Sequence, residues 1–103
     1  EHNKLVRDKI VDIITSSNKT AKTRILNDNE YKIALKEKLF EEIEEYFASE
    51  NDVNELADIK EVFNALCIAN GHSVEEVENA RLKKAIERGA FNKKIFLIET
   101  IEN

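Results

Sequence analysis

The chain has 103 residues, with 16 Lys and Arg against 21 Asp and Glu, and its formal net charge is −5. This length suits a single domain over residues 1–103 and leaves little room for a second. With only 2 glycines and no proline, the composition excludes a loop-rich sandwich, a collagen-like chain and a Pro-rich linker. The same scarcity of helix breakers favours a mostly helical fold.

Charge and cysteine content limit the partners and the compartment. The negative net charge makes the chain a poor candidate for binding duplex nucleic acid, because binding to the phosphate backbone needs a basic surface. No apolar run is long enough to span a bilayer, and no signal peptide opens the sequence. Cys67 is the one cysteine, which excludes an internal disulfide and fits a reducing compartment. We therefore expect a cytoplasmic protein without a membrane partner.

The first predicted helix covers residues 5–16, with Asn3 as its candidate N-cap. Residues 20–26 follow a polar break and alternate weakly between apolar and polar side chains, a pattern compatible with a short strand. Near the other end of the chain, residues 91–101 end in an apolar run that is compatible with a second strand. Pairing of these two segments would give a small two-stranded β element.

Capping-box patterns mark the starts of the other three predicted helices, because a short polar side chain is followed three residues later by Glu. The pairs are Asn27 with Glu30, Asp52 with Glu55, and Ser73 with Glu76. The helices that follow these pairs are predicted to end at about residues 49, 70 and 89.

The predicted architecture is an antiparallel bundle of about four helices, centred on two long helices joined by a short turn. Their apolar stripes are wide, while the other elements are short. Half a bundle of this kind commonly completes its core with a second copy. We therefore expect a homodimer or a tetramer, with the core completed by dimerisation.

Two pairs of carboxylates are the most informative feature of the sequence. Glu42 and Glu45 lie three residues apart on the second helix, and Glu55 and Asp58 do so on the third. Residues at this spacing share one helical face. Because a short loop joins the two helices, the two pairs are predicted to face each other across the seam.

A helical wheel at about 100° per residue places some of these carboxylates beside apolar side chains. Glu42 falls against the edge of the apolar stripe, Glu55 falls inside it, and Asp58 falls at its margin. A carboxylate among Val, Leu and Ile is costly unless it is paired, and four converging carboxylates repel one another.

A divalent cation with a preference for oxygen ligands would resolve both problems, and Mg²⁺ is the natural choice. Zn²⁺ is disfavoured because the chain has no set of Cys and His ligands. The alternative interpretation is structural, since Glu-rich helices often carry such pairs as solvated faces with Lys partners.

Basic side chains supply a candidate anion site. Lys84 and Arg88 lie four residues apart on the fourth predicted helix, and Arg81 lies one turn earlier. These cations either bind phosphate or complement the helix macrodipole, and the second explanation is as good as the first for Arg88. Arg7 is a further candidate for phosphate binding, although an exposed amphipathic helix accounts for it equally well.

The acidic motif resembles that of the all-α nucleoside triphosphate pyrophosphohydrolases, the superfamily of MazG and phosphoribosyl-ATP pyrophosphohydrolase. Its hallmark is ExxE, a spacer and then ExxD, which appear here as KLFEEIEE over residues 38–45 and ELADI over residues 55–59. The opening KLVRDKI, residues 4–10, and the later RGAF, residues 88–91, also look like the short single-domain members. The spacer of nine residues between the two acidic halves is short by the standard of the family.

The resemblance implies hydrolysis between the α and β phosphates, with Mg²⁺ as the cofactor and Mn²⁺ as a possible substitute. The products would be a monophosphate and pyrophosphate, from a nucleoside triphosphate or a substrate like phosphoribosyl-ATP. It implies that Lys84 faces the phosphates, and that one metal ligand or the neighbouring Glu41 orients the attacking water. The implied metal ligands are Glu42, Glu45, Glu55 and Asp58.

Two hypotheses of different class follow from the sequence. The first is a Mg²⁺-dependent nucleotide pyrophosphohydrolase, based on the converging carboxylates and the resemblance. The second is a non-catalytic helical module that binds a nucleotide or a partner helix. It remains open because acidic pairs on helices occur both in metal sites and on solvated surfaces. A Mg²⁺ titration followed by thermal melting separates them, since only a binding site links the ion to stability.

Overall fold

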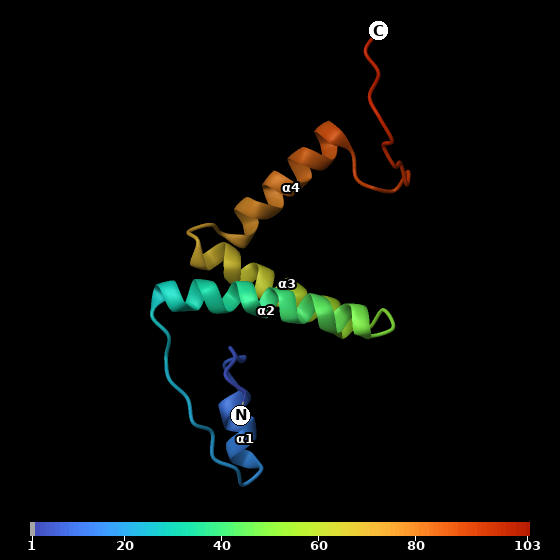
Figure 1. Cartoon of the computed structure of the whole chain (residues 1–103). Coiled ribbons are helices and arrows are strands. Elements are labelled where there is room, and N and C mark those ends of the chain that lie inside the picture. Colours follow the sequence, from blue (N-terminus) through green and yellow to red (C-terminus); the bar gives the residue numbers. More distant parts are fainter. Residues whose placement is uncertain (1) are drawn as a thin grey trace. The chain divides into compact units, whose positions relative to one another are not determined.

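Four α-helices form the regular secondary structure in the computed structural model, which describes residues 2–103 and has no strand within them (Figure 1). The prediction of a mostly α fold with about four helices is therefore confirmed. The chain divides into two compact units, the first ending at His72 and the second beginning at Ser73. The helices are α1 (Ile10–Ser16), α2 (Asp28–Ala48), α3 (Val53–Ala69) and α4 (Val74–Arg88).

The start of α2 is fixed by the capping box that the sequence predicts. The Asn27 side chain accepts a hydrogen bond from the Glu30 backbone N–H at 2.9 Å, and the Asn27 N–H donates to Glu30 Oε1 at 3.2 Å. Arg24 holds the same carboxylate through hydrogen bonds of 2.8 and 3.2 Å, and this contact lowers the pKa of Glu30. Two backbone donors at the helix end are thus satisfied by local side chains.

Replacing Asn27 by Ala should destabilise the protein by about 1 kcal/mol, because one N-terminal donor of α2 loses its acceptor. For a domain of this size the midpoint of thermal unfolding should fall by about 4–8 °C, measured by circular dichroism at 222 nm. Asn29→Ala, two residues later in the first turn of α2, is the control and should not lower the midpoint. An Asn27→Ala midpoint equal to that of the wild type would show that the capping box does not contribute to stability.

α2 and α3 pack side by side and run in opposite directions, because only four residues connect them (Figure 1). In this connection Asn51 adopts a left-handed backbone conformation with φ 63°. Asp52 caps α3 by accepting a hydrogen bond from the Asn54 N–H at 2.9 Å. The seam between the two helices buries Leu35 and Cys67. This antiparallel pair is the scaffold that carries all four predicted metal ligands.

The bounds of α4 also agree with the prediction. The Ser73 hydroxyl accepts from the Glu76 N–H at 3.0 Å at its start. Gly89 ends the helix with φ 84°, a left-handed conformation that glycine adopts without steric cost.

The first helix begins later than the sequence predicts, at Ile10 instead of Leu5, so the predicted start is wrong. Asn3 has a left-handed φ of 46° and is not the N-cap; Lys9 takes that position without a side-chain hydrogen bond. The residues before α1 instead send Lys4 and Arg7 onto α2 and α3, where both side chains form ion pairs. These contacts within the first unit accompany the non-helical course of the segment.

Two finer expectations about the fold are not shown. Residues 20–26 and 91–101 contain no strand, so the small β element is absent from the described part of the chain. On α2, Phe40 and Phe47 are 68% and 77% exposed, so the apolar surface that led us to expect a second copy is present. Dimerisation itself stays a prediction.

Among residues 2–103, no helix has both the length and the apolar character needed to cross a membrane.

Candidate metal centre

Two groups of carboxylates lie on the α2–α3 pair, and Glu42 belongs to both. Within each group, one oxygen atom per residue can be chosen so that all the chosen atoms lie within 4.8 Å of one another. Across the seam, the second group brings Glu42 of the first acidic pair to both members of the second pair, while Glu45 approaches Glu42 along α2 alone. The first group is Glu41, Glu42 and Glu45, and the second is Glu42, Glu55 and Asp58.

Burial distinguishes Glu42 from the other carboxylates. Its residue exposure is only 6%, which agrees with its predicted position against the apolar stripe. Its Oε2 atom is buried and accepts no hydrogen bond from residues 2–103, and the same holds for Oε2 of Glu55. A buried polar atom without a partner costs about 1–3 kcal/mol, and more when the group is charged. Two such oxygens at one seam mark a place where a positive ligand would be stabilised.

The pKa values of both residues respond to this environment. Loss of solvent raises the pKa of Glu42, and the neighbouring Glu45 raises it further, while the Lys38 ammonium acts in the opposite direction. For Glu55, loss of solvent again raises the pKa most, followed by the negative charges of Asp58 and Glu42. The ionised seam is thus destabilised in the absence of a cation.

The metal-free protein should lose stability as the pH rises above 4.5, the ordinary pKa of Glu, because Glu42 and Glu55 have raised pKa values only in the folded state. The folded protein binds more protons than the unfolded chain in this window, so the free energy of unfolding falls as the pH passes the raised values. Urea unfolding between pH 4.5 and 8 in a chelator measures the slope. Glu42→Gln should flatten it, and an equal slope in wild type and variant would contradict these pKa shifts.

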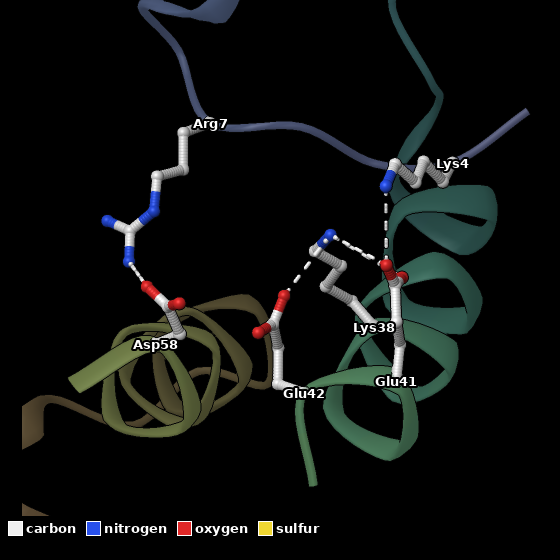
Figure 2. Close-up of polar contacts among 6 residues, drawn as sticks. All are labelled: Lys4, Arg7, Lys38, Glu41, Glu42 and Asp58. Atoms are coloured by element: carbon white, nitrogen blue, oxygen red, sulfur yellow. Dashed lines mark hydrogen bonds and ion pairs between the residues drawn. The ribbon is translucent and has the colours of Figure 1, made fainter. Parts of the chain in front are cut away.

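Cationic side chains cover part of the acidic surface (Figure 2). Lys38 Nζ lies 3.3 Å from Glu42 Oε1 and 3.4 Å from Glu41 Oε2, and Lys4 Nζ lies 3.4 Å from Glu41 Oε1. Partial desolvation of Glu41 is outweighed by Lys38 and Lys4, so the pKa of Glu41 is lowered. The pKa of Glu41 is thus shifted in the opposite direction to that of Glu42.

Arg7 and Asp58 form a second ion pair, with Nη2 at 2.5 Å from Oδ1 (Figure 2). The sequence pattern makes Arg7 a phosphate-binding candidate and does not indicate this pairing, which joins residues 51 positions apart. Nor does the predicted acidic motif include Lys38 as a partner of its carboxylates. The spacing of Lys38 to Glu41 and Glu42, three and four residues on one helix, is a signal that would have identified it.

A pocket of about 440 Å³ adjoins these ion pairs. Its polar lining includes Glu42, Asp58, Lys38 and Arg7, and its volume is within the range of small-molecule sites. Apolar and aromatic side chains from α2, α3 and the segment before α1 form the rest of the wall. They are Leu5, Val6, Tyr31, Leu35, Val62 and Ala65.

The donors of this centre fit a cation such as Mg²⁺ or Mn²⁺. Every ligand atom is a carboxylate oxygen, which suits such ions better than Zn²⁺ or Cu²⁺. The buried Oε2 atoms of Glu42 and Glu55 have coordination capacity that no residue among 2–103 uses. Glu42, Glu55 and Asp58 are thus the side chains best placed to hold an ion, and Glu45 is an exposed neighbour.

Three of the basic residues predicted to bind phosphate, Arg81, Lys84 and Arg88, lie on α4 in the second compact unit. Arg81 Nε pairs with Glu78 Oε1 at 2.5 Å on the same helix. Lys84 and Arg88 are exposed, and Arg88 lies in the last turn, where a cation complements the helix macrodipole. Their approach to the carboxylates stays a prediction.

Comparison with known proteins identifies no family for this chain. No family model matches it, and no curated protein and no solved structure matches it either. The resemblance to the pyrophosphohydrolases therefore stays a prediction based on the two acidic halves of the motif. The case for a function depends on the side chains of the α2–α3 seam.

Proposed function

We propose that the protein is a Mg²⁺-dependent nucleotide pyrophosphohydrolase, which cleaves between the α and β phosphates and releases a monophosphate and pyrophosphate. One observation carries the proposal. Glu42, Glu55 and Asp58 each have a carboxylate oxygen within 4.8 Å of one in the other two residues, and the Oε2 atoms of Glu42 and Glu55 are buried without a partner among residues 2–103. A solvated acidic face would not bury these atoms. The resemblance of the motif supports the same activity.

The chain's own residues have separate tasks in this proposal. When bound, Mg²⁺ would neutralise phosphate charge and lower the pKa of a coordinated water. Glu42, Glu55 and Asp58 would hold the ion, with Glu45 beside them. Glu41 has a lowered pKa, so its carboxylate is ionised at neutral pH and can accept a hydrogen bond from the attacking water.

Substrate binding in this proposal uses the pocket and the cations. Arg7 and Lys38 line the pocket together with two of the proposed metal ligands, so phosphate and ion would meet there. Tyr31, on the same wall, offers an aromatic face to a base. Lys84, Arg88 and Arg81 on α4 would hold phosphate charge that the metal does not cover.

The test is a panel of nucleoside triphosphates and phosphoribosyl-ATP, incubated with the protein and either Mg²⁺ or Mn²⁺, with pyrophosphate as the measured product. We expect metal-dependent release from at least one member and none in a chelator. Absence of release from every member with both ions would contradict the proposed activity.

Assembly into a homodimer or tetramer is part of the proposal, because Phe40, Phe47 and Phe63 leave an apolar surface on α2 and α3. Sedimentation equilibrium measures the mass. A monomer at concentrations where the protein is active would contradict it.

A non-catalytic interaction module is the second candidate, favoured by one specific observation. Glu41, Glu42 and Asp58 already have cationic partners, so part of the acidic charge is balanced without an ion. Such a module would bind a nucleotide or a partner helix without releasing pyrophosphate, and the substrate panel therefore separates the two candidates.

A further inference from the structure

The segment before α1 brings two cations to the proposed metal ligands from a distant part of the sequence. Lys4 pairs with Glu41 across 37 positions and Arg7 pairs with Asp58 across 51 positions. Figure 2 shows the segment passing over α2 and α3 with both side chains directed at the carboxylates. Contacts of this range contribute nothing to forming α1, so their effect is on the acidic centre itself.

The Arg7–Asp58 ion pair can be broken at a small cost in free energy. The two side chains are 55% and 36% exposed, and ion pairs in such surroundings contribute little stability because water competes with them. A divalent ion held by Asp58 would cancel the charge that attracts the guanidinium and repel it directly. Arg7 and the ion therefore compete for the same carboxylate.

A guanidinium released from Asp58 remains in the pocket. Arg7, Leu5, Val6 and Asp8 all line the 440 Å³ space, and Lys38 contributes a second cation to it. A planar guanidinium donates paired hydrogen bonds that match phosphate oxygens. An organic phosphate whose charged end lies at the metal would thus meet the Arg7 guanidinium in the same space.

We infer that Arg7 exchanges partners: it is the counter-ion of Asp58 before the metal binds and a phosphate-binding residue afterwards. The segment around it then forms the wall of the substrate site, and the ligand is an organic phosphate with an apolar or aromatic body. This inference rests on the proposed function, because it assigns Arg7 a task at the same centre. It adds that metal binding and phosphate binding are linked through one side chain.

The experiment compares wild type with Arg7→Gln by isothermal titration calorimetry. The first titration uses Mn²⁺ alone, and the second uses inorganic pyrophosphate at saturating Mn²⁺. Arg7→Gln should bind Mn²⁺ about two- to fivefold more tightly, because a competing cation is gone. It should bind pyrophosphate at least about tenfold more weakly, because a charge-assisted contact is lost. The exchange predicts that the affinity for Mn²⁺ rises while the affinity for pyrophosphate falls. Structural damage alone would lower both affinities.

Two further variants complete the test. Arg24→Gln removes another exposed ion pair, the one with Glu30, and should change neither affinity. Arg7→Lys keeps the charge but lacks the planar fork, so it should bind Mn²⁺ like the wild type and pyrophosphate more weakly; if Arg7→Gln fails to fold, this variant decides.

Each remaining outcome has a separate meaning. Wild-type Mn²⁺ affinity in Arg7→Gln, or unchanged pyrophosphate affinity in both Arg7 variants, would overturn the exchange and leave the proposed activity standing. A wild-type protein that binds no Mn²⁺ would overturn the metal centre and the exchange together.

Discussion

Replacing Glu42 by Gln should reduce Mg²⁺-dependent pyrophosphate release by about a thousandfold or more, because the residue common to both carboxylate groups no longer carries charge. The amide keeps the size of the side chain, so α2 and α3 should still pack. Lys38 keeps a partner in the variant, since it also contacts Glu41 at 3.4 Å. Initial rates with the best substrate of the panel, together with a circular dichroism spectrum, measure both effects.

A matched control lies on the same helix. Glu44 is exposed and belongs to neither carboxylate group, so Glu44→Gln should retain the wild-type rate. Asp58→Asn and Glu45→Gln should each lose turnover with the helical fold intact. A near wild-type rate in any of these ligand variants would remove that residue from the proposed site.

Mg²⁺ should raise the midpoint of thermal unfolding, because an ion that binds only the folded seam stabilises it. At a free concentration about 100 times the dissociation constant the gain is about 2.7 kcal/mol. For a domain of about 100 residues this corresponds to about 10 °C or more. Scanning calorimetry with Mg²⁺ and with a chelator measures the shift.

Glu42→Gln provides an unusual internal check on this shift. Because the pKa of Glu42 is raised, its ionised form is disfavoured in the folded protein. The variant should therefore melt a few degrees above the wild type in a chelator and show no further rise with Mg²⁺. Glu44→Gln should follow the wild type. The account would be contradicted if Glu42→Gln in a chelator melted below the wild type, or if Mg²⁺ raised its midpoint as much as it raises that of the wild type.

The bounds of α2, α3 and α4 could be predicted because the determining contacts are local. Asn27 and Ser73 each bond a backbone N–H three residues later, and Asp52 bonds one two residues later. Gly89 ends α4 through its own left-handed conformation. Interactions that span so few residues are visible in a sequence pattern.

The start of α1 could not be predicted in the same way. Its apolar periodicity extends back to Leu5, but the structure begins the helix at Ile10, and Lys4 and Arg7 before it pair with residues on α2 and α3. The pairing of residues 37 and 51 positions apart depends on tertiary structure, which local propensity does not contain.

The candidate site was predictable in its residues and less so in its geometry. Periodicity placed Glu42 and Glu55 beside the apolar seam, and both have a buried oxygen. It did not show that Glu45 groups with Glu41 on α2 while Asp58 groups across the seam, because side-chain directions decide these contacts.

The most direct test of the central claim is a crystal structure of the protein soaked in Mn²⁺, with anomalous scattering used to locate the ion. The account predicts a peak about 2 Å from carboxylate oxygens of Glu42, Glu55 and Asp58, with Arg7 displaced from Asp58. A fully loaded crystal with no peak between these side chains, and with Arg7 still paired to Asp58, would contradict it.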